Sequence, residues 1–158
     1  MGARVAPFFP NSVRLSSTRF LDDPPGRPSV TPYRFVPHTA DVAAELRAES
    51  ERGLYQAGVD ALRNLLVGTS PVRSLEQRPI AVRGTDPTER LVRFLGDVLY
   101  LYDTERFLPD RVLPLGVSGE PFDPARHHAL REVKAVTYHG AAVVPDGDGY
   151  RATLVFDV

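Results

Sequence analysis

The sequence predicts an α+β protein in which two helices pack on a mainly antiparallel or mixed β-sheet. Apolar residues recur at helical spacing in two segments, one after Ser50 and one after Asp86. The chain after Phe107 instead has β character, and short strand patterns precede each helical segment. The order strand, helix, strand, helix and then a run of strands is typical of folds in which helices cover one side of an antiparallel sheet.

The first helix has recognisable signals at both ends. Ser50 is a candidate N-cap, and Gly68 ends the helical pattern. The apolar positions between them fall on one face at about 3.6 residues per turn: Leu54, Ala61, Leu62, Leu65 and Leu66. This face is expected to be buried.

The second helix begins with a strong capping sequence. Asp86 is the N-cap, Pro87 occupies the first helical position, and Glu89 stands three residues after the cap, where cap and glutamate can each accept a free N–H group. The expected buried face follows at helical spacing: Leu91, Leu95, Val98, Leu99 and Tyr102. It should pack against the sheet or against the first helix.

Strands are expected at residues 33–36 and 42–48 before the first helix, and at residues 80–84 between the helices. After the second helix they are expected at residues 111–117, 132–138, 141–144 and 150–158. The Asp-Gly pairs within residues 145–149 predict a tight turn that joins the last two strands. Residues 120–131, which include Pro121, Pro124, His127 and His128, are expected to form a surface loop.

Residues 1–32 are expected to be a disordered, proline-rich tail, and residues 33–158 a single folded domain. The tail holds six of the fifteen prolines and shows neither the helical nor the strand period. Its four arginines and two aspartates give it a formal charge of +2, which leaves −3 on the rest of the chain. This composition fits a basic recognition arm and equally a start codon placed too far upstream.

The composition excludes several classes of function. A chain of 158 residues, 42% hydrophobic and 25% charged, is typical of one soluble domain. A net charge of −1 argues against binding that depends on neutralising many phosphates, so little direct nucleic-acid binding is expected. The absence of cysteine excludes disulfides, thiolate metal sites and cysteine nucleophiles. No membrane-spanning apolar run and no signal peptide are recognisable, so the expected location is the cytoplasm.

The common catalytic motifs are also missing, including the phosphate-binding glycine loop, the Gly-x-Ser-x-Gly elbow and His-Glu-x-x-His. The remaining candidates are acidic residues in apolar surroundings: Asp41, Asp103 and Asp157. If the last strand brings the C-terminus beside Asp41, two aspartates and the terminal carboxylate converge. Oxygen ligands alone favour Ca²⁺ or Mg²⁺ over zinc. An ordinary exposed aspartate near the chain end is the alternative.

Three further residues deserve a separate interpretation. His38 and His139 border strands, where a histidine can be a metal ligand or an acid/base group, or can simply pack and cap backbone groups. Lys134 is the only lysine, and Tyr138 lies four residues later on the same face of the predicted strand. That lysine occurs only once does not assign a role to Lys134.

Read together, these residues resemble the archease family. The resemblance covers residues 33–158 and rests on five blocks in the family's order and with similar spacing: residues 38–42 (His-Thr-Ala-Asp-Val), 99–105 (Leu-Tyr-Leu-Tyr-Asp-Thr-Glu), 119–123 (Gly-Glu-Pro-Phe-Asp) followed by 126–127 (Arg-His), 132–139 (Glu-Val-Lys-Ala-Val-Thr-Tyr-His) and 155–158 (Val-Phe-Asp-Val). Each block alone is a weak signal, but five in order are a specific one.

The resemblance implies an archease-like fold and a protein that is not an enzyme but a cofactor of an RtcB-type RNA ligase. Such a ligase joins a 2′,3′-cyclic or 3′-phosphate RNA end to a 5′-hydroxyl in tRNA splicing and RNA repair, and uses GTP and Mn²⁺. In this family the cofactor promotes guanylylation of the ligase and lets it turn over repeatedly. No small-molecule substrate and no catalytic residue of its own are implied.

The resemblance also implies a metal site, often occupied by Ca²⁺, whose ligands here are Asp41, Asp157 and Val158. These are the groups that the acidic residues already suggested, and Mg²⁺ or Mn²⁺ are further candidates. Two other functions stay open. One is a small metal-dependent phosphoesterase that uses Asp41, Asp157 and either His38 or His139. The other is a general chaperone, which ranks last because no broad apolar segment stands out in the sequence.

Overall fold

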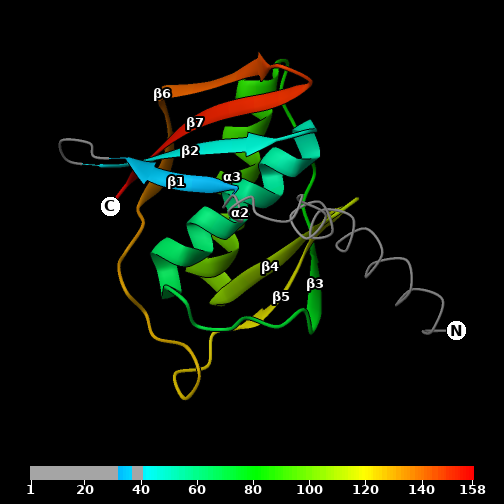
Figure 1. Ribbon diagram of the computed structural model, residues 1–158. Helices are drawn as coiled ribbons and strands as arrows, with labels where there is room; N and C mark the ends of the chain where they lie inside the picture. Colours follow the sequence, from blue (N-terminus) through cyan, green and yellow to red (C-terminus); the bar gives the residue numbers. More distant parts are fainter. Residues whose placement is uncertain (1–31, 37–40) are drawn as a thin grey trace, which may run out of the picture. The chain divides into compact units, whose positions relative to one another are not determined.

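The computed structural model describes residues 32–36 and 41–158, which form two antiparallel sheets with two helices between them (Figure 1). The predicted tail lies almost wholly outside the described residues. The α+β prediction is confirmed, with one difference: the strands are divided between two sheets instead of forming one. In the described part of the chain, no helix is long and apolar enough to cross a membrane.

The larger sheet has the strand order β1-β2-β7-β6. It consists of β1 (Tyr33–Val36), β2 (Val42–Ala48), β7 (Gly149–Asp157) and β6 (Ala135–Asp146). β2 and β7 pair along their lengths, and β6 and β7 are joined by the predicted tight turn, in which Gly147 has a positive φ of 61°. The last strand of the chain therefore lies in the interior of the sheet, between β2 and β6.

Helices α2 (Glu51–Val67) and α3 (Pro87–Glu105) begin where the sequence predicts. The hydroxyl of Ser50 accepts the N–H of Gly53 at 3.0 Å, and the carboxylate of Asp86 accepts that of Glu89 at 3.0 Å. Every residue of the two predicted apolar faces is buried, and Leu54, Leu62 and Leu95 have no exposed surface. The helices thus supply the core that both sheets cover.

The smaller sheet has the order β3-β5-β4, with β3 (Glu76–Pro79), β4 (Phe107–Leu113) and β5 (Gly116–Pro121). Residues 111–117, predicted as one strand, contain the turn between β4 and β5, because Pro114 lacks the N–H that a continuous strand would need. The strand predicted at residues 80–84 is β3, which lies earlier in the chain, at Glu76–Pro79. Its partner β5 begins at Gly116, opposite Pro79, and beyond that pair the N–H of Ile80 donates to the carbonyl of Leu115 in the turn before β5.

The strands predicted at residues 132–138 and 141–144 are one strand, β6. It begins only at Ala135, which is opposite Asp157 near the end of β7. The pairing is irregular between Thr137 and Ala142, and Gly140 lies in this interval with a positive φ of 74°. The gap that the sequence pattern suggested between two strands is therefore a local irregularity within one strand, β6.

Candidate functional site

Asp41 and Asp157 lie at the same end of the four-stranded sheet. Asp41 immediately precedes β2, Asp157 ends β7, and these strands are antiparallel with Val42 opposite Phe156. Side chains directly opposite on antiparallel strands share a face, with Cβ atoms about 5 Å apart. Both residues are partly exposed. The register thus brings the start of β2 and the end of β7, which the sequence separates widely, to one end of the sheet.

The C-terminal residue is held at the same end of the sheet. Val158 packs its side chain against the hydrophobic core, and the backbone N–H of Lys134 donates to the carbonyl of Asp157 at 2.7 Å. This hydrogen bond fixes β7 against the segment that leads into β6. The terminal carboxylate is therefore kept next to Asp157 by packing on one side and by the backbone on the other.

These oxygen atoms suit a hard cation. Two aspartate side chains and a terminal carboxylate offer the ligand type that Ca²⁺ and Mg²⁺ prefer, with no nitrogen or sulfur donor. Among residues 32–36 and 41–158, no three His, Cys, Asp or Glu side chains are grouped as metal ligands. The predicted set is compatible with this finding because its third member is the main-chain carboxylate of Val158.

The other candidates from the sequence are dispersed. His38 lies outside the described residues, as do the neighbouring residues 37, 39 and 40. His139 is exposed on β6, and Asp103 is exposed near the end of α3. Lys134 is exposed, and its backbone N–H donates to the carbonyl of Asp157. Its main chain therefore lies beside the C-terminus, which is not a catalytic contact.

A buried charged cluster occupies part of the segment that was predicted to be a surface loop. Glu120 and His127 are only 2% and 1% exposed, so that prediction is wrong for both. The carboxylate of Glu120 accepts two hydrogen bonds from Arg126, at 2.7 and 2.9 Å, and one from the backbone N–H of Arg73 at 2.8 Å. These hydrogen bonds lower the pKa of Glu120 to about 2, with Arg126 the largest cause, although burial acts in the opposite direction.

His127 fastens this cluster to two neighbouring segments. Its Nδ1 accepts the N–H of Asp123 at 2.9 Å, so Nε2 carries the proton in the neutral ring. Nε2 lies 3.1 Å from the carbonyl oxygen of Pro71 and 3.2 Å from Glu120. The composition of the loop did not indicate that Glu120 and His127 are buried. The only signal in the sequence was that both residues belong to a block of the family resemblance.

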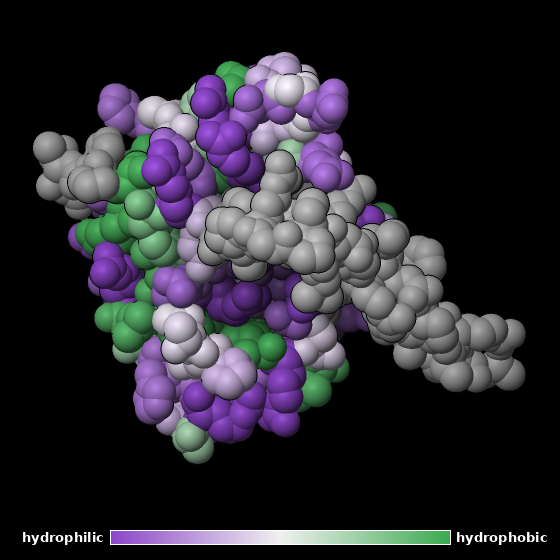
Figure 2. Space-filling view, viewed as in Figure 1, coloured by the Kyte–Doolittle hydropathy of each residue, from purple (hydrophilic) through white to green (hydrophobic). Residues whose placement is uncertain are grey.

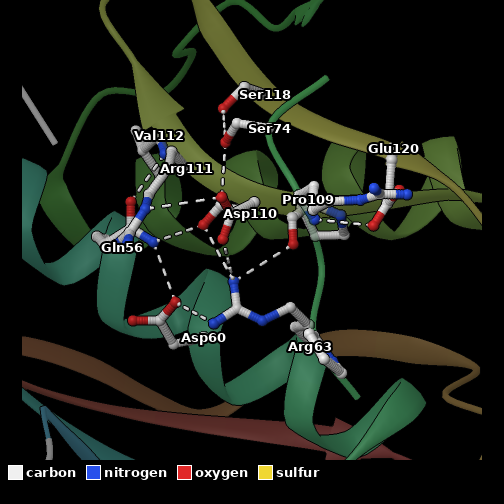
Figure 3. Close-up of polar contacts among 12 residues, drawn as sticks. Gln56, Asp60, Arg63, Ser74, Pro109, Asp110, Arg111, Val112, Ser118 and Glu120 are labelled. Atoms are coloured by element: carbon white, nitrogen blue, oxygen red, sulfur yellow. Dashed lines mark hydrogen bonds and ion pairs between the residues drawn. The ribbon is translucent and has the colours of Figure 1, made fainter. Parts of the chain in front are cut away.

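A third cluster joins α2 to β4 and was not predicted (Figure 3). Arg63 donates to the carboxylate of Asp60 at 2.9 Å and to the carbonyl and carboxylate of Asp110 at 3.0 and 3.3 Å. Gln56 donates to Asp60 at 3.0 Å and accepts the N–H of Val112 at 2.8 Å. Asp110 lies where the pairing of β4 with β5 shifts, which turns its groups toward α2.

A polar pocket of about 300 Å³ lies beside this cluster and is also lined by Tyr33, Asn64 and Ser70. Burial raises the pKa of Asp60 and Arg63 opposes that shift. Figure 2 shows hydrophilic atoms gathered at the centre of this face, between the two sheets. Because the charged groups are matched to one another, the cluster holds α2 against β4.

Two antiparallel sheets with two helices between them define a small α+β fold that other proteins share. The solution structure of protein 1598 from Methanobacterium thermoautotrophicum has the same fold, with a TM-score of 0.68 at 22% identity over 82% of this chain and 100% of that one. The crystal structure of an archease, possible chaperone, from Thermotoga maritima gives a TM-score of 0.55 at 22% identity over 78% and 94% of the two chains.

The chain belongs to the Archease protein family, whose model matches residues 33–158. Protein archease from Sulfurisphaera tokodaii is 28% identical over 136 residues, which cover 80% of this chain and 98% of that relative. The family resemblance drawn from the five sequence blocks is thereby confirmed. None of these matches names an enzymatic activity.

Proposed function

We propose that this chain is a protein cofactor of an RtcB-type RNA ligase, which promotes guanylylation and multiple turnover of that ligase in tRNA splicing and RNA repair. The observation that supports the proposal is membership of the archease family, together with a register that brings the start of β2, next to Asp41, and the end of β7, at Asp157, to one end of the sheet. The chain itself performs no chemistry on RNA. The proposal includes a cytoplasmic location.

The acidic strand end is proposed to hold one divalent cation, Ca²⁺ in the first instance and Mg²⁺ or Mn²⁺ otherwise. Asp41, Asp157 and the terminal carboxylate of Val158 would be its ligands, and the cation would supply positive charge that can attract phosphate oxygens. The residues of the chain itself contribute position. Val158 packs against the core and the backbone carbonyl of Asp157 accepts the N–H of Lys134, so the main chain that carries these groups is held in place.

The same side of the molecule is suited to contact a protein. Figure 2 shows hydrophobic atoms along the side on which the C-terminus lies in Figure 1. A protein interface usually has an apolar centre surrounded by polar residues, and the hydrophobic atoms on this side fit such a centre. We place the ligase there, with the acidic strand end directed at its nucleotide-binding site.

The test is multiple-turnover RNA joining by the partner ligase with the wild-type protein, Asp41→Asn and a chain extended at the C-terminus. Both variants should lose most of the stimulation, because the amide lacks the charge that holds a hard cation and the extension moves the terminal carboxylate away. A chain with the same extension at the N-terminus is the control and should stimulate fully. Full stimulation by Asp41→Asn would contradict the proposed role of the site.

The same preparations distinguish the two other functions. A phosphoesterase would hydrolyse phosphate esters without any ligase, and the hydrolysis would depend on Asp41 and Asp157. A general chaperone, the role named as possible for the Thermotoga maritima protein, would suppress aggregation of unrelated unfolded proteins. Neither activity is expected here. Circular dichroism of each variant shows whether it is folded.

A further inference from the structure

The segment that connects the two sheets ends at the acidic strand end. This connecting segment comprises residues 122–134, between the end of β5 in the smaller sheet and the start of β6 in the larger one (Figure 1). Its residues all belong to the described part of the chain and form neither helix nor strand. The last of them, Lys134, donates its backbone N–H to the carbonyl of Asp157 at 2.7 Å. The connecting segment therefore contacts the end of the chain directly.

Strand β7 is paired further on its β6 side than on its β2 side. In the described part of the chain, the pairing of β2 with β7 extends as far as Val42 and Phe156, whereas Ala135 of β6 lies opposite Asp157. The hydrogen bond from Lys134 adjoins that last pair. The backbone of Asp157 is therefore held from the side on which the connecting segment arrives.

Two buried side chains anchor the second half of the connecting segment. His127 is 1% exposed, and Val133, which directly precedes Lys134, is 2% exposed. Residues 128–132 between them are exposed. The position of Lys134 thus depends on where these two side chains are seated.

Backbone hydrogen bonds attach the exposed stretch to the end of α2. The N–H of His128 donates to the hydroxyl of Ser70 at 3.1 Å, and that of Leu130 to the carbonyl of Leu66 at 2.8 Å. Leu130 also lies close to Gly68, where a Cβ would come within 2.8 Å of its Cδ1 atom. An ordered chain, and not a free loop, therefore joins the two buried side chains, and coupling between distant groups is carried by such packed and hydrogen-bonded chains.

His127 is suited to act as an anchor because both nitrogens of its ring have partners. Nδ1 accepts the N–H of Asp123 at the start of the connecting segment, and Nε2 lies 3.1 Å from the carbonyl oxygen of Pro71, in the loop between α2 and β3. A neutral imidazole offers one acceptor and one donor, which matches these two partners. The side chain has no exposed surface, so water does not compete for either hydrogen bond.

We propose that His127 is a positioning residue for the acidic strand end. By anchoring the connecting segment, it fixes the backbone N–H of Lys134 and, through that hydrogen bond, the main chain of Asp157 and Val158. His127 itself contacts no cation in this arrangement. The effect on cation binding rests on the proposed metal site, whereas the effect on the backbone at Lys134 does not.

The test compares two substitutions of His127. His127→Leu is apolar and makes neither hydrogen bond, whereas His127→Gln keeps one acceptor and one donor. Hydrogen exchange of the Lys134 amide, followed by NMR, should be about tenfold faster in His127→Leu than in wild type, and intermediate in His127→Gln. Calorimetric titration should show a calcium Kd raised about fivefold in His127→Leu and closer to wild type in His127→Gln.

Gln56→Leu is the matched control for a general loss of stability. Gln56 is half-buried, accepts the N–H of Val112 and donates to the carbonyl of Asp110, so its replacement also removes hydrogen bonds, but between α2 and β4. It should lower the melting temperature and leave the calcium Kd unchanged. Exchange of the Lys134 amide should rise no more than that of Leu95 in the core, because both then exchange by global unfolding.

Several outcomes would overturn the proposal. In His127→Leu these are an unchanged exchange rate at Lys134, a rise no larger than that at Leu95, or a calcium Kd equal to that of wild type. If wild type binds no calcium, the proposed metal site is wrong, and the exchange rates alone decide the positioning role. If His127→Leu does not fold, His127→Gln is compared with Gln56→Leu by the same criteria.

Discussion

The cluster around Glu120 and the acidic strand end at Asp41 and Asp157 are both built from charged groups, but they differ in burial. Glu120 is buried, and its carboxylate contacts the guanidinium groups of Arg126 and Arg73. Asp41 and Asp157 at the strand end are instead partly exposed.

The difference indicates what each cluster contributes. A matched and buried cluster is complete within the chain, so it stabilises the position of the segment that follows β5. Partly exposed carboxylates remain accessible to a cation from solvent. Burial therefore suits the first cluster to structural support, and exposure suits the second to binding.

The largest expected effect is on the Glu120 cluster. Glu120→Gln should lower the free energy of unfolding by about 3 kcal/mol, because it leaves Arg126 and His127 facing an uncharged amide in a buried place. Urea denaturation followed by circular dichroism measures this. Glu105→Gln is the matched control, since Glu105 pairs with Arg78 at 2.7 Å but is 45% exposed, and its loss should cost less than about 1 kcal/mol. Equal effects would show that burial does not distinguish the pairs.

The pH dependence of stability should show the same contrast. The pKa of Glu120 is lowered to about 2 in the folded chain from an ordinary 4.5. Its contribution is therefore complete above pH 4.5 and is lost as the pH falls from there toward about 2. The difference in unfolding free energy between wild type and Glu120→Gln should shrink over this interval. A difference that stays constant from neutral pH to pH 2 would contradict the assignment.

A smaller effect is expected at the acidic strand end. Calcium at about ten times its Kd should stabilise the wild-type chain by about 1.4 kcal/mol, since a ligand that binds only the folded state shifts the unfolding equilibrium. Asp157→Asn should remove most of this stabilisation. Melting curves with calcium and with a chelator measure it, and calorimetric titration gives the affinity. If Asp157→Asn responds to calcium as wild type does, the ligand assignment is wrong.

The smallest effect is expected from the part of the chain that belongs to neither cluster. Deletion of residues 1–31 should leave the melting temperature and the ligase stimulation unchanged, because the sequence shows no periodic apolar face there that would tie it to a core. A large fall in melting temperature would show that this segment contains a structural element.

Many features of the fold could be predicted because their physical causes are local. Ser50 and Asp86 accept N–H groups three residues away, and the apolar faces of the helices follow from a fixed number of residues per turn. The Asp-Gly turn between β6 and β7 depends on the positive φ that glycine permits. In each case the interacting groups are a few residues apart, so the sequence contains both partners in one short window.

The remaining features were decided by tertiary structure, because their causes lie far apart in the chain. The end of β3 depends on where β5 begins, and the burial of Glu120 and His127 depends on residues 71–73, about fifty positions earlier. The candidate metal site depends on both local sequence and tertiary structure. Its proposed ligands could be suggested from residue types and from the family resemblance, but only the pairing of β2 with β7 brings the start of β2, next to Asp41, to the end of β7. Local propensity does not specify which distant strands pair, because that choice depends on the packing of the whole core.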